Sequence, residues 1–384
     1  MVGLADVMRH HGPAYMERYR ANLLPSHARA ITAIMHCRTL ALGGHLAVCT
    51  HCERYHVLYH SCRNRACPRC GWDITERWLA HQQELLLPVP YFHVVFTIPA
   101  ELRQVVRQHQ KALLPVLFRT AYAALAKLCA ADRFLGGQIG ALAVLHTWTR
   151  TLNYHPHIHM LVPGGALSPE GGWKALPRRR KRFLVPVRAL AKVFAGKFMA
   201  AARRALPNVA FPYIPYKKRW VVFAKPVVHG TDNVLRYLGR YVHRTAIGDS
   251  AIIACTDTSV TFRYQDSRTY QRKTMTLAPH EFLRRFLQHV LPKGLHRVRA
   301  YGLLHPAHRT TLKRLQFMLA PPHCPVSPAA KAEDTAGVSC PRCGVGTLLL
   351  LHRLTPDECY AMLDDGQRTL QPRAPPTSPQ RQAA

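Results

Sequence analysis

Stretches of apolar residues with turn-forming residues at their ends recur through the middle of the chain. Residues 91–98 are rich in aromatic and β-branched side chains and end at a proline, and residues 141–149 and 154–163 are apolar runs that end in turns. Such runs predict strands. Residues 220–224 predict another strand, and residues 251–277 have the pattern of a three-stranded meander. The middle of the chain is therefore expected to contain a sheet.

Helical periodicity alternates with these strands. Residues 1–35 predict one or two helices, and residues 72–87 predict a linking helix that ends at a proline. Residues 100–131 repeat leucines at helical spacing, and residues 279–290 place phenylalanines on one face of an amphipathic helix. The polar, proline-rich residues 365–384 are expected to be disordered.

The predicted strand 154–163 carries three histidines at alternate positions. Because residues two apart in a strand point to the same face, His155, His157 and His159 are expected to project side by side. Ile158 and Met160 would then face a core. Two imidazoles about 6–7 Å apart along a strand can hold one divalent cation. The motif is short, so it indicates a metal site only in combination with other motifs in the chain.

The charge of the chain points to a polyanionic partner. Its 53 Lys and Arg against 20 Asp and Glu give a formal net charge of +33, which favours nucleic acid. An anionic membrane surface is the rival partner. We find no apolar span of about 20 residues and no basic amphipathic helix with an apolar anchor. The N-terminus also lacks the layout of a signal peptide, so a cytoplasmic, nucleoid-associated protein is expected.

Two dense basic runs are candidate contacts for backbone phosphates, although such runs are also common in solvated loops. Their residues are Arg178, Arg179, Arg180, Lys181 and Arg182, then Lys217, Lys218 and Arg219.

The 12 cysteines indicate metal ligands more than disulfides in a chain without an export signal. Cys49-x-x-Cys52 and Cys67-x-x-Cys70 form two knuckles, and together they supply the four ligands of a structural zinc. Four further residues could complete a second zinc site or surround the first: Cys37, His45, His60 and Cys62. Cys340-x-x-Cys343 predicts either a C-terminal zinc ribbon or a metal-free remnant.

Residues 233–244 predict a helix that carries two tyrosines. Tyr237 and Tyr241 are four residues apart and therefore lie on one face. Arg240 and Arg244 follow the same period beside them. Hydroxyls beside guanidinium groups suit a phosphodiester site, although a tyrosine pair at this spacing is also common in packed cores.

These stretches together resemble the insertion sequence 91 family of rolling-circle transposases, which have a His-hydrophobic-His (HUH) single-strand endonuclease domain. The resemblance covers roughly residues 30–305. One departure is Ala66, where a histidine is expected. The matching stretches are residues 37–45 with Cys49 and Cys52, 59–65 with Cys67 and Cys70, 89–93, 146–148, 155–159, 162–165 and 237–244.

The resemblance implies an α+β fold in which an antiparallel sheet flanked by helices, of the ferredoxin or RRM-like kind, has the two histidines on a central strand. Taken as a whole, the chain is expected to have four parts: N-terminal helices with a zinc-binding module (1–87), an endonuclease domain (88–305), a linker that could include a small zinc ribbon (306–364), and a disordered tail (365–384). The partner would be single-stranded DNA at transposon ends and targets, and the protein could self-associate.

The resemblance also implies a mechanism. His157 and His159 would hold Mg²⁺ or Mn²⁺ against the scissile phosphate, and Tyr237 or Tyr241 would attack phosphorus to leave a 5′-phosphotyrosine. Arg240 and Arg244 could stabilise the charge that develops.

A third metal ligand is needed, and His243 and His155 are candidates. Three other interpretations remain open: a non-catalytic zinc-finger DNA-binding protein, a replication initiator or relaxase, and a hydrolytic metallonuclease.

Overall fold

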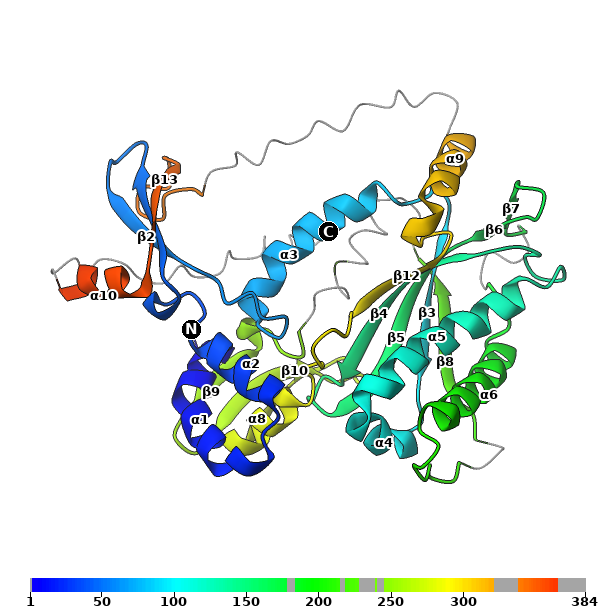
Figure 1. Ribbon diagram of the computed structural model, residues 1–384, viewed down its shortest axis with the longest axis horizontal. Coiled ribbons are helices and arrows are strands. Elements are labelled where there is room, and N and C mark those ends of the chain that lie inside the picture. The colour runs from blue at the N-terminus through cyan, green and yellow to red at the C-terminus, as the bar shows by residue number, and fades with distance from the viewer. Residues whose placement is uncertain are drawn as a thin grey trace.

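The centre of the molecule is an antiparallel sheet of five strands in the order β12-β4-β5-β3-β8 (Figure 1). The computed structural model describes residues 2–177, 184–214, 218–227, 239, 245–320 and 338–364, without the side chains of 72–77, 79, 80, 363 and 364. The strands are β3 (Tyr91–Thr97), β4 (Gly140–Trp148), β5 (Tyr154–Pro163), β8 (Val221–Pro226) and β12 (Val298–Gly302).

Two helices cover one face of this sheet, α5 (Gln110–Cys129) and α6 (Val187–Ala205) (Figure 1). In β5, Ile158 and Met160 point into this core, and in α6 Phe194 and Phe198 point back from the helix side. Alternation along the strands and a four-residue repeat along the helix bring these apolar faces together.

Helix α5 is long and apolar enough to cross a membrane, a property that the sequence analysis did not anticipate. However, 61% of its most apolar window is buried within the molecule, where it packs against the sheet and α6. This burial is that of a core helix.

The β4–β5 hairpin sets which residues face one another. Residues 149–153 form its turn, in which the Thr149 N–H donates to the Asn153 carbonyl at 2.9 Å. Leu152 has φ +60°, a left-handed conformation that is uncommon for leucine. The register shifts between His146 and Trp148, and His146 lies directly opposite His157.

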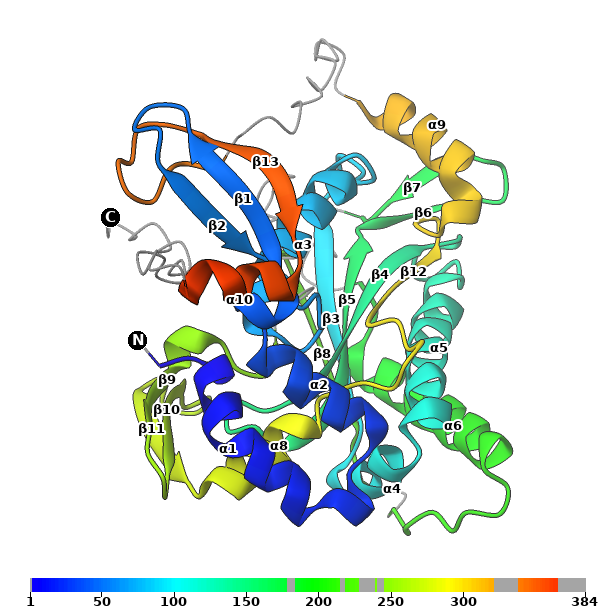
Figure 2. The same ribbon diagram turned by 60° about the vertical axis from the view of Figure 1, so that its left-hand side comes forward.

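The two N-terminal helices, α1 (Leu4–Arg18) and α2 (Pro25–Met35), share a second core with elements that follow residue 250 (Figure 2). These are the meander β9 (Ile252–Cys255), β10 (Val260–Gln265) and β11 (Arg272–Leu277), and α8 (Pro279–Leu287). Phe282 and Phe286 of α8 are buried in this core, as the amphipathic pattern predicts.

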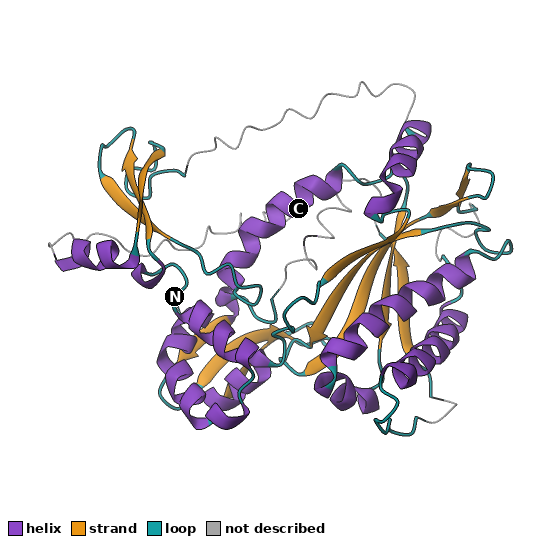
Figure 3. Cartoon of the chain, viewed as in Figure 1, coloured by secondary structure: helices purple, strands orange, loops and turns teal. Residues whose placement is uncertain are grey.

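A third, smaller sheet combines strands from the N-terminal and C-terminal parts of the chain. It has the order β13-β1-β2, from β1 (Gly44–Cys49), β2 (Tyr55–Tyr59) and β13 (Leu348–Leu354). Helix α3 (Pro68–Gln83) runs from this sheet toward the central sheet (Figures 1 and 3). The remaining elements are α4 (Arg103–Gln108), β6 (Gly165–Leu167), β7 (Trp173–Ala175), α9 (Arg309–Leu319) and α10 (Pro356–Asp364).

The predicted α+β class with a helix-flanked antiparallel sheet is confirmed. The expectation of a separate C-terminal ribbon within 306–364 is wrong, because β13 pairs with β1 of the N-terminal module over six residues. Helix α6, strand β12 and helix α9 were not predicted. Residues 365–384 lie outside the described part of the chain.

Candidate functional site

The histidine strand lies at the centre of the sheet and alternates as predicted. Along β5 the residues from Tyr154 to Met160 alternate between buried and half-buried. His155, His157 and His159 are the half-buried ones, and Ile158 and Met160 are buried in the core on the other face. The histidines therefore lie on the sheet face opposite α5 and α6.

A third imidazole comes from the neighbouring strand. His146 of β4 lies opposite His157, and ligand nitrogens of His146, His157 and His159 lie within 4.8 Å of one another. The ring centroids of His146 and His159 are 4.5 Å apart, and those of His157 and His159 are 4.8 Å apart. We call these three residues the imidazole cluster. Three imidazoles this close can bind one cation between them.

Hydrogen bonds orient two rings of the imidazole cluster. The His157 Nδ1–H donates to the His155 carbonyl oxygen at 2.7 Å, which leaves Nε2 for a metal. His159 Nδ1 lies 2.8 Å from Nε2 of His93. Burial lowers the pKa of His93 to about 3, so His93 is neutral and can accept the His159 Nδ1–H. That tautomer leaves Nε2 of His159 for a metal as well.

His155 is not part of this cluster among the described residues. Its ring centroid lies 5.2 Å from that of His157, and burial lowers its pKa to about 4. His155 was expected as a candidate third ligand. The structure instead places His146 beside the two strand histidines, and the other candidate, His243, lies outside the described residues.

Eight of the described cysteines form two clusters, neither of which is the predicted one. Cys37, Cys62, Cys67 and Cys70 form the first, and three pairs of their sulfurs are 3.6 Å apart. A tetrahedral zinc with Zn–S bonds of about 2.3 Å needs sulfurs about 3.8 Å apart, so this set fits the ion. The expectation that Cys67 and Cys70 share one zinc with the other N-terminal knuckle is therefore wrong.

The other N-terminal knuckle meets the C-terminal one. Cys49, Cys52, Cys340 and Cys343 form the second cluster. The Cys49 sulfur accepts from the backbone N–H groups of Cys52 and His51, both at 3.4 Å. These bonds, with that of Cys52 as the larger cause, lower the pKa of Cys49 to about 6. A thiolate is the form that binds metal.

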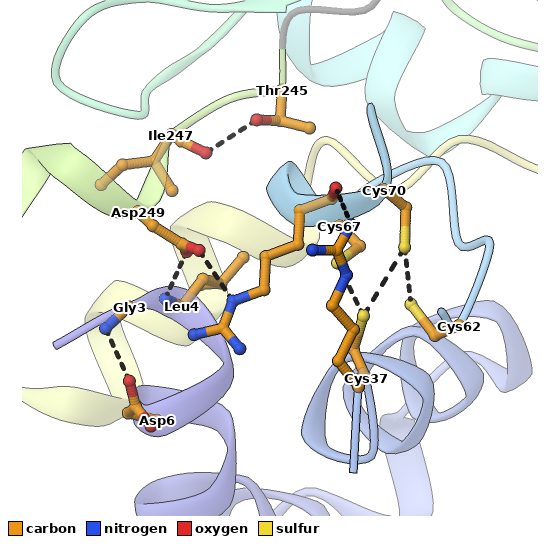
Figure 4. A network of polar contacts seen from close by, with 12 residues as sticks. Gly3, Leu4, Asp6, Cys37, Cys62, Cys67, Cys70, Thr245, Ile247 and Asp249 are labelled. Atoms are coloured by element: carbon orange, nitrogen blue, oxygen red, sulfur yellow. Dashed lines mark hydrogen bonds and ion pairs between the residues drawn. The ribbon is translucent and has the colours of Figure 1, made fainter. Parts of the chain in front are cut away.

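The first cysteine cluster is joined to two distant parts of the chain (Figure 4). Arg69 lies between Cys67 and Cys70, and its Nε donates to Asp249 at 3.0 Å. The other carboxylate oxygen of Asp249 accepts from the Leu4 N–H at 2.8 Å. One carboxylate thus connects the cysteine loop, the start of α1 and the chain that leads into β9.

His45 and His60 do not belong to either cysteine cluster. Nε2 of His60 lies 3.0 Å from Nδ1 of His45, and Nδ1 of His60 lies 3.0 Å from the Leu42 carbonyl oxygen. The prediction that they are metal ligands is therefore not supported. They act as a hydrogen-bonded pair between β1 and the residue after β2.

Comparison with known proteins decides the family. The chain is 39% identical over 326 residues to "Putative transposase y4qJ" of Sinorhizobium fredii, covering 80% of this chain and 81% of that protein. It is 32% identical over 294 residues to the transposase for insertion sequence element IS801 of Pseudomonas savastanoi pv. phaseolicola, covering 71% and 69%. The chain belongs to the insertion sequence 91 family of transposases.

Two family models match different parts of this transposase. The model described as "Transposase zinc-binding domain" matches residues 7–98, and the one described as "Putative transposase" matches residues 140–311. The first includes both N-terminal knuckles, and the second includes β4, β5 and the tyrosine segment. No solved structure was found that matches the chain.

Several predicted site residues of the transposase lie outside the described part of the chain. These are Tyr237, Arg240, Tyr241, His243 and Arg244, and the basic residues Arg178, Arg179, Arg180, Lys181, Arg182 and Lys217. Lys218 is described and forms an ion pair with Glu101. Arg219 is exposed.

Sequence reasoning missed the roles of His146 and His93. Both lie on strands that were predicted, at positions where the two-residue period puts them on the histidine face. Strand register would have identified them. His146 lies opposite His157 in the β4–β5 pair, and His93 lies diagonally across from His159 in the β3–β5 pair. Register depends on the hairpin turn and the shift after His146, which the sequence does not reveal.

Proposed function

We propose that this transposase nicks and joins single-stranded DNA through a tyrosine nucleophile that works beside the imidazole cluster. One observation supports the proposal: three histidines gather on the face of the central sheet opposite α5 and α6, and the last described residue before the tyrosine segment lies on that same face. Val227 is the last described residue before that segment, and it packs with Tyr91, Leu142 and Leu161 on the histidine face.

The far end of the tyrosine segment is anchored too. Thr245 is buried, and its hydroxyl donates to the Ile247 carbonyl at 2.7 Å. Ile247 is part of the core of α1, α2 and α8. Tyr241 is only four residues before Thr245, so the reach of the segment is limited. The same core contains Leu152 of the β4–β5 turn, so the segment is anchored beside the turn that precedes the histidine strand.

The imidazole cluster would hold a divalent cation through His146, His157 and His159. Such a cation neutralises and orients the scissile phosphate. Of Mg²⁺ and Mn²⁺, the donor set favours Mn²⁺, because Mg²⁺ prefers oxygen ligands and keeps its waters. His93 would fix the ring of His159, as partners of metal-bound histidines do.

Cleavage would then follow from the chemistry of the phenol. A tyrosine with a pKa near 10 is a weak nucleophile at neutral pH. Its oxygen would form the bond to phosphorus as it loses its proton to solvent, and the bond to the 3′-oxygen would break. That oxygen gains a proton to become the 3′-hydroxyl. Arg240 and Arg244 would stabilise charge on the non-bridging oxygens.

A basic cavity beside the imidazole cluster supports a single strand as the substrate. The cavity has a volume of about 1170 Å³ and lies between α2, the loop before α3 and the chain before β12. Its lining includes basic side chains and apolar ones such as Leu42, Trp78 and Leu291, but no acidic residue among those described. The basic residues are Arg29, Arg63, Arg65, Lys293 and Arg297.

The cavity is connected to the histidine face by stacked rings. The Arg297 guanidinium lies 5.3 Å from the Trp148 ring centroid, and the Trp148 ring stacks on His146 at 4.6 Å. Unpaired nucleotides expose bases that suit apolar walls and phosphates that suit guanidinium groups. We therefore propose that the strand flanking the scissile bond occupies this cavity, in the cytoplasm where the DNA is.

Strand cleavage tests the proposal. Labelled single-stranded DNA from the ends of the flanking element is incubated with the protein and Mn²⁺. The wild type is expected to nick it, whereas His157→Ala with His159→Ala should reduce the rate by about 100-fold or more. His280→Ala, which changes an exposed histidine of α8, is the control and should cleave normally. Equal cleavage by the double variant would contradict the proposed site.

A further inference from the structure

The second cysteine cluster joins residues almost 300 positions apart. The sulfurs of Cys49 and Cys343 are 3.7 Å apart, and those of Cys52 and Cys340 are 3.8 Å apart. These distances are far longer than a disulfide bond of about 2.05 Å. They equal the edge of a ZnS₄ tetrahedron, about 3.8 Å for Zn–S bonds of about 2.3 Å.

Both knuckles have the backbone arrangement of metal-binding turns. The Gly346 N–H donates to the Cys343 sulfur at 3.4 Å, which matches the bond from Cys52 to the Cys49 sulfur. A Cβ on Gly346 would lie 2.5 Å from that Cys49 sulfur. A side chain therefore cannot be added there without moving the cluster, so the two turns are fitted to each other.

The surrounding strands hold the two knuckles in register. β1 pairs with β13 from Gly44 to Cys49. Beyond the strands, the Thr50 N–H donates to the Thr347 carbonyl at 2.9 Å, and the Thr347 N–H donates to the Thr50 hydroxyl at 3.0 Å. The N-terminal module and the segment that begins at residue 338 thus contact each other through backbone hydrogen bonds as well as cysteines.

The apolar core at this junction is small. The buried residues around the cluster are Ala47, Cys49, Cys340 and Leu348, and the neighbouring buried group is Val57, Leu354 and Cys359. Several leucines of β13 are exposed. A core of this size does not stabilise a three-stranded sheet in water, and small modules of this kind depend on a metal.

We propose that Cys49, Cys52, Cys340 and Cys343 bind one Zn²⁺, which fastens the C-terminal segment to the N-terminal module. The family model for the zinc-binding domain ends at residue 98 and so contains only half of these ligands. The zinc module is completed only when the chain from residue 340 onward has been made. The inference is independent of the cleavage chemistry.

A cut chain tests this zinc clasp. A site for a specific protease is inserted between Ala329 and Ala330 of the full-length protein, and the cut protein is examined by native mass spectrometry. The C-terminal fragment should remain bound, with two zinc ions per complex, and a chelator should release it. Release of the fragment while both ions are retained would overturn the proposal.

Paired substitutions keep the test decisive even if one variant folds poorly. Cys340→Ser with Cys343→Ser, and separately Cys49→Ser with Cys52→Ser, should each remove one zinc ion. All four changes together should still remove only one. Cys359→Ser is the control, since this cysteine lies in the same C-terminal segment but outside the cluster, and it should keep both ions. Loss of two ions in the fourfold variant would show separate sites.

Discussion

His146 and His157 face each other across the β4–β5 pair, and His159 completes the imidazole cluster from the next outward position of β5. The two-residue period predicts His157 and His159 as neighbours, because that depends only on local geometry. The period cannot predict His146, because its partner is set by the turn at 149–153. The same holds for the second cysteine cluster. Each Cys-x-x-Cys turn can be recognised in the sequence, but which two turns meet depends on the pairing of β1 with β13.

The residue scale gives a prediction about metal affinity. His146→Ala is expected to weaken Mn²⁺ binding by more than about 100-fold, and His93→Ala by about 10- to 100-fold, because the loss of an orienting partner costs that much. His155→Ala should change it by less than about 3-fold, since His155 contributes its carbonyl to His157 and the substitution retains it.

Electron paramagnetic resonance titration of Mn²⁺ into zinc-loaded protein measures these affinities. If His155→Ala weakened binding as much as His146→Ala did, the assignment of the third ligand would be wrong.

Among the helices and strands, α6 could have been predicted from the sequence, whereas β12 could not. Leu190, Phe194, Phe198 and Ala202 recur at every fourth position and are fully buried, so the signal for an amphipathic helix was present in the sequence. Strand β12 has no such clear signal, because it is short and all five of its residues are half-buried. Its strand character comes from pairing with β4, which is tertiary information.

Packing of α6 on the sheet predicts a stability effect. Phe194 lies 5.1 Å from the Phe96 ring and 5.3 Å from the Trp220 ring, centroid to centroid, and is fully buried. Phe194→Ala should lower the free energy of unfolding by about 3–5 kcal/mol, the usual cost of removing a buried phenylalanine. The exposed Lys192→Ala on the same helix should change it by less than about 0.5 kcal/mol. Urea denaturation followed by circular dichroism measures both.

At the scale of the whole molecule, segments far apart in sequence are interleaved. The N-terminal helices pack on the meander and α8, and the N-terminal knuckle of β1 meets the C-terminal one. A division of the chain into consecutive domains could not predict these contacts, because the composition of a segment does not show which distant segment packs against it. The charge, by contrast, is a property of the whole chain, and its prediction of a nucleic-acid partner agrees with the DNA partner that a transposase implies.

The basic cavity predicts how DNA binding depends on salt. The side chains of Arg29, Arg63 and Lys293 have no hydrogen-bond or ion-pair partner within the described residues. Replacing all three with alanine should make the slope of log K, the association constant, against log salt concentration less negative by about 2. Each phosphate contact with a single strand contributes about −0.7 to this slope. Fluorescence anisotropy with single-stranded DNA at several salt concentrations measures this slope.

A matched variant controls for total charge. Lys192, Arg203 and Arg204 are exposed on α6, on the opposite side of the sheet from the histidines. Their triple replacement with alanine should leave the slope nearly unchanged. An equal loss of slope in both triple variants would mean that binding follows net charge and not the cavity.

In the proposed mechanism, Tyr237 or Tyr241 becomes covalently joined to DNA. The direct measurement is incubation with labelled single-stranded element ends and Mn²⁺, followed by denaturing electrophoresis. We expect a labelled band at the mass of the protein plus DNA that is absent from Tyr237→Phe with Tyr241→Phe, although this variant still binds DNA. Cleaved DNA without any protein adduct, or an adduct that persists in the double variant, would contradict a mechanism in which these tyrosines are the nucleophiles.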